Sequence, residues 1–452
     1  MLLKQVICQK TYKVEGIDME PLYTVKNKVR RFGVTIHPET AIEWGVSHHQ
    51  KMKVGFGVRS YQTTIRTSSD LSTREVWLGG KVLQWLMVPT FCRYEISVEN
   101  NIVAIGPFIG ILESRSGVEK AAQLVSQYDK IGGAIMAFTE GGIKRDKKVI
   151  SGMVFNPDTR KWIRGTYAYP SSLFKKVPVS EETRKHLYME IGKDRIFNTP
   201  VTGKWEMYML LMSLPGIQAH LPNTIIFTHP KDIWEFLSKY GQVYIKPVVG
   251  MRGTGILKVS KNREGITVQY RENKRNCKLS FHNDAEANVF FTDKLTSGCY
   301  MVQQAINQIN EENQIVDFRL TIVKNGAGIW EEIGFYARYA PSGSIISNVT
   351  EGGKILQGDA AIKHILRLTS SQTRRFKMSV SDIAMKVVQS IDECDGMHYG
   401  NLGFDIAVDT SRHIWILEVN RDPGFIHAIR SRAQLSNMLY AKRLAGIAGK
   451  KG

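Results

Sequence analysis

Short apolar and polar stretches alternate through residues 22–112, and turn-forming residues separate them. Stretches such as FGVTIHP, REVWLGG and YEISVENNIVAIG are rich in the β-branched and aromatic residues that strands favour, and Gly, Pro, Asn and Asp lie between them. This pattern predicts a β-rich region in the first quarter of the chain.

The pattern changes from Ile102 onward. IVAIGPFIGIL reads as an apolar strand, an amphipathic helix is expected near Val118–Ile131, and GAIMAF reads as a second apolar strand. This succession predicts a small α/β domain. Met153–Gly165 then predicts a hairpin with FNPDTRKW as its turn, and Ser180–Lys193 predicts a helix with Ser180 as its N-cap.

A second α/β region follows FNTPVTGKWEMYMLL. Thr228-His-Pro opens a predicted helix that stops at Gly241, and the strand QVYIKPVVG comes directly after it. The rest alternates strands (YMVQQAI, DFRLTIV, GFDIAVD, HIWILEVN) with one helix at Asp382–Cys394. We therefore expect three regions, at residues 1–101, 102–197 and 198–452.

The composition fits an ordered protein of more than one domain. The 452 residues are 43% hydrophobic and 23% charged, and no apolar run approaches the length of a membrane span. The start of the chain lacks the pattern of a secretory signal, so we expect cytoplasmic synthesis. The five cysteines are scattered singly, which favours free thiols over a disulfide or a zinc site.

The formal net charge of +19 favours anionic partners. Lys and Arg are spread along the chain, so a nucleic-acid-binding tail is not indicated. Two interpretations stay open: attraction of an anionic polymer, and a charged surface that serves solubility and draws nucleotides.

The first candidate site is YIKPVVGMRGTGI, in which Lys246 precedes a glycine-rich loop. Glycines allow the backbone to approach a polyphosphate closely, and Lys246 is near enough to the loop to meet a phosphate group. The loop could bind phosphate through Gly250, Arg252, Gly253, Thr254 and Gly255. For this stretch alone, however, a glycine-rich hairpin without a ligand is the commoner outcome.

The second candidate is the pair of strands GFDIAVD and HIWILEVN. Glu418 and Asn420 are two residues apart and so share one face. A two-residue turn centred on Thr410-Ser411 would place Asp405 opposite Ile416 and diagonal to Glu418. Two carboxylates and an amide oxygen suit Mg²⁺, whereas an exposed polar sheet face is the alternative. The apolar flanks favour burial, where unpaired carboxylates are costly.

The third candidate is a pair of arginines. DFRLTIV places Asp317 and Arg319 on one face of a strand, and Arg338 follows in GFYARYAP. Two arginines on neighbouring strands could hold a transferring phosphoryl group, although an arginine taken singly more often forms a surface or interdomain ion pair.

The order of these motifs resembles that of ATP-grasp ligases of the glutathione synthetase and ribosomal-protein glutamate ligase type. The resemblance covers about Phe197 to Ile429. It implies that ATP is bound by Lys204 of GKWEMY, Lys246, the glycine loop, and Gln303 and Gln304 at a hinge. It also implies catalytic roles for Arg319, Arg338 and Asn348, and Mg²⁺ ligation by Asp405, Glu418 and Asn420.

A closer resemblance rests on GPFIGIL, the FNPDTRKW hairpin, YPSSLF, RIFNTP, GKWEMY, YIKPVVGMRGTGI and EVNRDPG. These stretches are similar to the endospore coat-associated YheC/YheD family of ATP-grasp proteins, which implies a spore-forming bacterium and a link to the spore coat. YPSSLFKKV departs from the pattern, because we expect an acidic residue and an arginine there.

Together the motifs predict an α/β protein with α+β subdomains. An N-terminal β-rich extension (1–101) and a pre-ATP-grasp α/β domain (102–197) precede the ATP-grasp fold (198–452). We expect an ATP-dependent carboxylate-amine ligase that uses ATP and Mg²⁺, passes through an acyl phosphate and is associated with the spore coat. Small-molecule or peptide carboxylates and amines are the expected substrates, and an anionic polymer or a second copy of the chain is a candidate partner.

Two other classes of function remain in competition. One is a non-catalytic, ATP-binding or structural coat protein on the same scaffold, since a fold alone does not imply an activity. The other is a nucleic-acid binder, which lacks any recognisable module and ranks last.

Overall fold

The structure of the protein is a computed structural model that describes residues 22–28, 33–200, 203–250, 254–273, 275–312, 314–345, 353–394 and 396–446. The chain divides into two compact units. The first comprises Met1–Gly110, Val125–Ser172 and Lys442–Gly452, and the second comprises Ile111–Leu124 and Leu173–Ala441.

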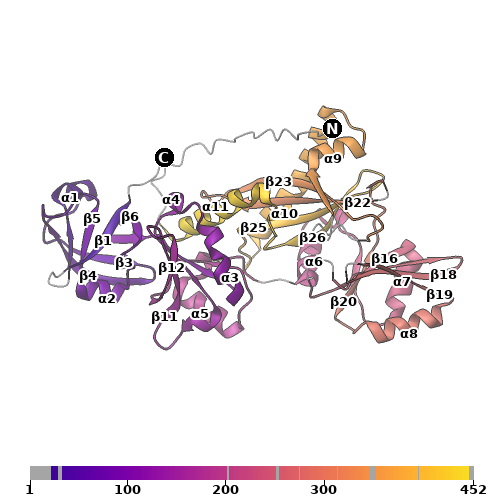
Figure 1. The fold of residues 1–452 in the computed structure, drawn as a ribbon, viewed down its shortest axis with the longest axis horizontal. Helices are drawn as coiled ribbons and strands as arrows, with labels where there is room; N and C mark the ends of the chain where they lie inside the picture. Colours follow the sequence, from indigo (N-terminus) through magenta and orange to yellow (C-terminus); the bar gives the residue numbers. More distant parts are fainter. Residues whose placement is uncertain are drawn as a thin grey trace. The chain divides into compact units, whose positions relative to one another are not determined.

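The first unit contains a closed β-barrel (Figure 1). Its strands follow the order β1 (Tyr23–Lys28), β5 (Glu75–Gly79), β2 (Val34–Ile36), β4 (Arg59–Thr67), β3 (Lys51–Phe56), β7 (Ile102–Gly106) and β6 (Arg93–Glu99). Pairing of β1 with β6 closes the barrel. Two short helices, α1 (Pro38–Trp44) and α2 (Gly80–Leu86), complete this part of the unit. The predicted β-rich region is confirmed.

The predicted strand IVAIGPFIGIL is two strands, β7 and β8 (Phe108–Leu112). Pro107 lies between them and has no N–H to donate to a strand ladder. The predicted helix at Val118–Ile131 is likewise divided, into α3 (Arg115–Lys120), a 3₁₀ turn at Ala121–Val125 and α4 (Tyr128–Ile131). Strand β9 (Ala134–Phe138) follows as expected.

The predicted hairpin is formed by β11 (Val149–Asn156) and β12 (Lys161–Tyr167). At its turn the Asn156 side chain accepts hydrogen bonds from the backbone N–H groups of Asp158 and Thr159, so the Asn-Pro-Asp stretch reverses the chain. The short strand β10 (Ile143–Lys144) pairs with β11 on the other side.

Besides α3, the second unit contains most of β13 (Ser172–Lys175), which pairs in parallel with β14 (Ile196–Phe197). Helix α5 (Glu181–Ile191) connects them. Ser180 is its N-cap, as predicted, and its hydroxyl accepts a hydrogen bond from the Thr183 N–H.

An antiparallel six-stranded sheet forms one half of the remaining chain. Its order is β15 (Thr224–Ile226), β20 (Tyr300–Gln304), β16 (Gln242–Pro247), β17 (Leu257–Asn262), β18 (Gly265–Glu272) and β19 (Arg275–Phe281). Helices α7 (Pro230–Tyr240) and α8 (Asp284–Lys294) pack on one face, where Ile233 and Phe291 join a core with Val243 and Val259. The predicted start and stop of α7 are confirmed, with His229 as N-cap and Gly241 as C-cap.

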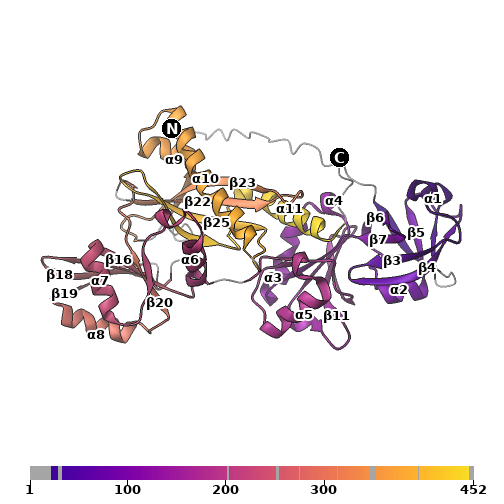
Figure 2. The same ribbon diagram turned by 180° about the vertical axis from the view of Figure 1, so that it is seen from behind.

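A second sheet forms the other half, with the order β24 (Lys354–Gln357), β23 (Trp330–Tyr339), β22 (Gln314–Lys324), β25 (Asn401–Val408) and β26 (Ile414–Asn420). The two-residue strand β21 (Asn310–Glu311) pairs with β22. Helices α6 (Lys204–Ser213), α9 (Gly358–Ile365) and α10 (Ser370–Glu393) cover one face, and α11 (His427–Leu444) contributes Ile429 and Ala433 to a core on the other (Figures 1 and 2).

Helix α10 begins at Ser370 instead of Asp382. Thr369 and Gln372 form a reciprocal capping box that starts the helix earlier than the apolar pattern suggested.

The predicted register of the β25–β26 hairpin is wrong. Asp405 lies opposite Glu418, and Ile406 lies opposite Ile416, with an irregularity between the two positions. The turn is longer than two residues, because Asp409 accepts hydrogen bonds from the N–H groups of Ser411 and His413 and from the Ser411 hydroxyl. Arg412 takes a left-handed conformation to close this turn.

Four of the five cysteines lie in the described ranges, and all four are free thiols. Of the helices in those ranges, none is both long enough and apolar enough to cross a membrane.

Candidate functional site

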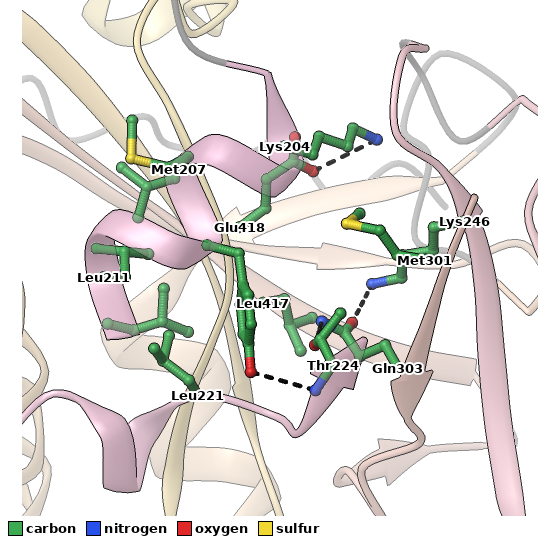
Figure 3. Close-up of a pocket in the computed structure, with 13 residues that line it drawn as sticks. Lys204, Met207, Leu211, Leu221, Thr224, Lys246, Met301, Gln303, Leu417 and Glu418 are labelled. Atoms are coloured by element: carbon green, nitrogen blue, oxygen red, sulfur yellow. Dashed lines mark hydrogen bonds and ion pairs between the residues drawn. The ribbon is translucent and has the colours of Figure 1, made fainter. Parts of the chain in front are cut away.

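A pocket lies between the two sheets of the second unit and gathers four of the predicted site residues (Figure 3). The pocket is partly open to solvent. Its lining comprises Lys204, Met207, Tyr208, Leu211, Leu221, Thr224, Lys246, Met301, Gln303, Ile416, Leu417, Glu418 and Val419.

One wall is built by the neighbouring strands β16 and β20, which place Lys246 beside Gln303. The Lys246 ammonium donates a 2.5 Å hydrogen bond to the Gln303 side-chain oxygen. Gln303 is only 4% exposed, and its amide donates in turn to the Thr224 hydroxyl at 2.9 Å. This chain of hydrogen bonds holds the ammonium group of Lys246 in one direction.

Burial lowers the pKa of Lys246 to about 8, and Lys204 adds to the lowering, while Glu418 opposes it. A nearby anion would stabilise the charged form of a buried ammonium group whose pKa is lowered. The position therefore suits a phosphate group.

The opposite wall carries Lys204 and Glu418, which face each other in Figure 3. Lys204 is the first residue of α6, and its ammonium lies 3.9 Å from Glu418 Oε2. Burial raises the pKa of Glu418, and nearby Asp405 raises it further, against the lowering by Lys204. The positive end of α6 and Lys204 thus provide a second attraction for negative charge.

Beside Glu418, two arginines and two aspartates form one network on neighbouring strands. Arg338 makes a bidentate pair with Asp317, at 2.6 and 2.8 Å, and also lies 3.2 Å from Asp405 Oδ1. Arg319 Nε donates to the same Asp405 oxygen at 2.5 Å. The cross-strand pairs Asp317–Arg338, Arg319–Asp405 and Asp405–Glu418 bring these side chains together.

This network keeps Asp405 ionised. Burial opposes the charge, but Arg319 and Arg338 outweigh it and hold the pKa of Asp405 at about 2. The two carboxylates also strengthen the positive charge of Arg338, whose pKa lies above its ordinary value despite burial.

Reasoning from sequence assigned no partner to Arg338 and did not find the apolar side of the pocket. Asp317 is the carboxylate that holds Arg338, and its place on the same face as Arg319 was the available signal. Met207, Leu221 and Ile416 come from separate elements, and each alone looks like an ordinary core residue. Only the fold brings these three side chains together on the apolar wall of the pocket.

Several predicted residues lie elsewhere or cannot be placed. The Gln304 side chain accepts a hydrogen bond from the Asn223 backbone N–H and does not line the pocket. Gly250, Thr254 and Gly255 are exposed residues of the glycine loop. Arg252, Gly253 and Asn348 lie outside the described residues.

The three predicted magnesium ligands lie on adjoining strands. Asp405 is opposite Glu418, and Asn420 is opposite Gly403 on the same two strands. The donor set consists of oxygen atoms alone, with one carboxylate ionised by its arginine neighbours, and such a set fits Mg²⁺. Over the described ranges, no group of three His, Cys, Asp or Glu side chains forms a metal cluster, so the amide oxygen of Asn420 and phosphate oxygens would have to complete the coordination.

Comparison with known proteins defines the class. The family model described as YheC/D like ATP-grasp matches residues 193–444, which are more than half of the chain and include both walls of the pocket. The class is therefore ATP-grasp, as the order of motifs predicted.

The chain belongs to the YheC/D-like ATP-grasp family. It is 23% identical over 372 residues to the endospore coat-associated protein YheD of Bacillus subtilis (strain 168), covering 77% of this chain and 80% of the relative. It is also 23% identical over 344 residues to the endospore coat-associated protein YheC of the same strain, covering 73% and 91%. The resemblance drawn from the sequence is confirmed.

Among solved structures, N5-carboxyaminoimidazole ribonucleotide synthetase from Thermotoga maritima aligns with 74% of this chain and 75% of its own, at 12% identity and a TM-score of 0.41.

Proposed function

We propose that this protein is an ATP-dependent carboxylate-amine ligase that works through an acyl phosphate. The observation that carries the proposal is the pocket in which Lys204, Lys246 and Glu418 meet, next to the network of Arg319, Arg338, Asp317 and Asp405. Lysines for a polyphosphate, oxygen ligands for a cation and arginines for a transferring group are three separate requirements. A protein with only a structural role would need none of them.

In this proposal the lysines hold ATP. Lys246 and Lys204 bind its phosphates, the glycine loop (Gly250, Arg252, Gly253, Thr254, Gly255) covers them, and the apolar side of the pocket takes the adenine. Gln303 orients Lys246 and offers the adenine a polar edge, and Gln304 supports the hinge through Asn223. Residues 198–452 would form the catalytic ATP-grasp part, with 102–197 as the preceding α/β domain and 1–101 as an extension.

Asp405, Glu418 and Asn420 would hold Mg²⁺, which supplies charge neutralisation for the phosphate oxygens. The γ-phosphoryl group passes to an oxygen of a substrate carboxylate, with ADP as the leaving group. An amine then attacks the acyl carbon, phosphate leaves, the amine nitrogen loses one proton to solvent, and an amide forms. Arg319 and Arg338 stabilise the charge that grows in both steps, and we include Asn348 among the catalytic residues.

We further propose that the product contributes to the spore coat, since both relatives are named endospore coat-associated proteins. The protein would be made in the cytoplasm and end in or near the coat.

The test is trapping of the acyl phosphate. The full chain is incubated with MgATP, hydroxylamine and a panel of carboxylic acids, and hydroxamate and ADP are measured. We expect ADP and hydroxamate with at least one acid. Arg338→Ala should lower turnover at least about a hundredfold, or about 2.7 kcal/mol, with little change in MgATP affinity, because the arginine acts mainly on charge formed during transfer.

Arg432→Ala provides the control, since Arg432 is an exposed arginine that is also paired with a carboxylate, Glu331. It should leave turnover unchanged. If the wild-type protein binds MgATP but forms neither ADP nor hydroxamate with any acid, a non-catalytic ATP-binding coat protein becomes the better explanation.

A further inference from the structure

A second basic cluster lies in the same unit, at the ends of strands β13 and β26. Lys175 is the last residue of β13, and Arg421 directly follows β26, one residue after Asn420. The neighbouring groups are Lys176, Glu113 and Asp422. The site described above uses none of these five side chains.

Lys175 is buried, and none of the described acidic residues pairs with it. It is only 3% exposed, and over the described ranges no hydrogen bond or ion pair of its ammonium group is found. The charged groups that act on it are both cations, Arg421 and Arg184. Burial, followed by these two arginines, lowers the pKa of Lys175 to about 8. A buried charge is costly unless it is paired, so this position favours an added anion.

Arg421 adds a second unfilled donor. Its Nη1 atom is buried and, within the described part of the chain, has no hydrogen-bond partner. An unsatisfied buried donor costs about 1–3 kcal/mol, more when it is charged. An acceptor on a ligand would remove that cost.

The carboxylates of the cluster are already engaged elsewhere. Glu113 lies 2.6 Å from the Lys176 ammonium, and Asp422 lies 3.8 Å from it. Both acidic groups therefore face Lys176, and Asp422 also acts on Arg421, so that within the described part of the chain neither of them pairs with Lys175. Three basic groups stand against two acidic ones, so the cluster keeps a positive charge.

The position also fits a ligand site. Strand β13 runs parallel to β14, and ligands of open α/β sheets bind beyond the carboxyl ends of such strands. Arg421 is three residues after Glu418 on one strand end, so their Cα atoms are at most about 10 Å apart. A short molecule can span that distance.

We propose that Lys175 and Arg421 bind a carboxylate group of the substrate, separate from the carboxylate that is activated. The inference rests on the proposed ligase function and narrows it. The substrate is then a dicarboxylic acid or an acidic peptide, held by one acid group at Lys175 and Arg421 and phosphorylated on another beside Glu418. This assigns a substrate role to the segment YPSSLFKKV, the stretch that departs from the family pattern.

The test measures binding without requiring turnover. Calorimetry on the full chain compares glutarate, its neutral analogue glutaramide and inorganic phosphate. We expect glutarate to bind, glutaramide to show no binding, and Lys175→Met and Arg421→Met each to weaken glutarate binding at least tenfold. MgATP affinity should stay within about twofold of the wild type in Lys175→Met.

The matched control is Lys185→Met, which removes one positive charge from an exposed lysine on α5. It should leave glutarate binding unchanged. Thermal melting checks the fold, and Lys175→Met should not lower the melting temperature, because it removes an unpaired buried charge and keeps the chain length of the side chain.

Affinity for glutarate should fall as pH rises through about 8 in the wild type, since binding requires protonated Lys175. In Lys175→Met this slope should disappear. The other charged groups facing the site are Arg421, Arg184, Lys176, Glu113 and Asp422, and all of them remain in this variant.

The outcomes separate the two proposals. Unchanged glutarate binding in both variants, or no binding to the wild type, overturns the inference. Tighter binding of phosphate than of glutarate, lost in Lys175→Met, also overturns it and leaves a phosphate site. Hydroxamate formed equally well by Lys175→Met preserves the ligase and rejects the second carboxylate site. Lys175-dependent glutarate binding without any hydroxamate preserves the anion site and rejects the ligase.

Discussion

At the scale of single residues, burial distinguishes the lysines that favour binding of an anion. Lys246 and Lys175 are both lysines with a pKa lowered to about 8, chiefly by burial. They differ in their surroundings, because Lys246 has Gln303 as an acceptor and Glu418 nearby, whereas both charged neighbours that act on Lys175 are cations. Both buried ammonium groups therefore favour an anion. We assign a phosphate of ATP to Lys246 and a substrate carboxylate to Lys175 because their neighbours differ.

Lys246→Met tests the first role. The charged form of Lys246 attracts the phosphates, so the variant should weaken MgATP binding at pH 7 about tenfold, or about 1.4 kcal/mol. Calorimetry at a series of pH values gives a second readout. The pKa of Lys246 in the protein without ATP is about 8. The affinity of the wild type for MgATP should therefore fall as the pH rises through 8, and the variant should lack that dependence on pH.

Lys239→Met is the control for this prediction, because Lys239 is an exposed lysine near the end of α7, the helix that packs on the sheet containing Lys246. Equal loss of affinity in both variants, or a pH slope retained in Lys246→Met, would contradict the role of Lys246 as the phosphate ligand.

At the scale of elements, the β25–β26 hairpin sets the site geometry. Its turn at residues 409–413 shifts the pairing by one residue from the predicted register, and the irregularity between Asp405 and Ile406 shifts it by one more, so that Asp405 faces Glu418 instead of Ile416. Asp409 organises this turn with its carboxylate, which accepts from Ser411 and His413 and also from the Trp415 indole at 2.9 Å. These bonds lower the pKa of Asp409 against the raising effect of burial.

Asp409→Ala should destabilise the protein by about 2 kcal/mol, because several hydrogen bonds to one charged acceptor are lost together. Ser411→Ala removes a single hydroxyl donor and should cost about 1 kcal/mol or less. Denaturant unfolding of the full chain would measure the free energy of unfolding of both variants. A neutral Asp409→Ala would show that the register depends on the strands and not on the turn.

At the scale of the whole molecule, the formal charge of +19 exceeds what one MgATP site requires. We therefore expect weak, long-range attraction to an anionic polymer, through exposed basic residues outside the pocket. Binding to polyglutamate should fall steeply between low and near-physiological salt, where charges are screened beyond about 8–10 Å.

A pull-down on polyglutamate, an anionic wall polymer and a neutral glycan across a salt series would test this attraction. MgATP binding, measured in the same buffers, should change less because its charges are partly buried. Equal retention on all three polymers at low salt would leave solubility as the role of the surplus charge.

The sequence alone determined the ATP-grasp class of the protein and named several of the residues that the structure gathers at the candidate site. Order and spacing carry that information: Lys246 before glycines, Arg319 beside Asp317, and Glu418 two residues from Asn420 are local patterns of strands and loops. The capped helices α5 and α7 were predictable for the same reason, since their end signals lie within a few residues.

Only the tertiary structure decided which of these groups meet. Three features depend on strand order, turn length and the irregularity in the β25–β26 ladder, which no local pattern specifies. They are the pairing of Arg338 with Asp317, the contact of Lys204 with Glu418 and the register of Asp405. The surroundings of Lys175 are also set by the tertiary structure. A lysine in a strand carries no sign of burial in its own sequence, and only the fold shows that its ammonium group is buried and has no partner among the described residues.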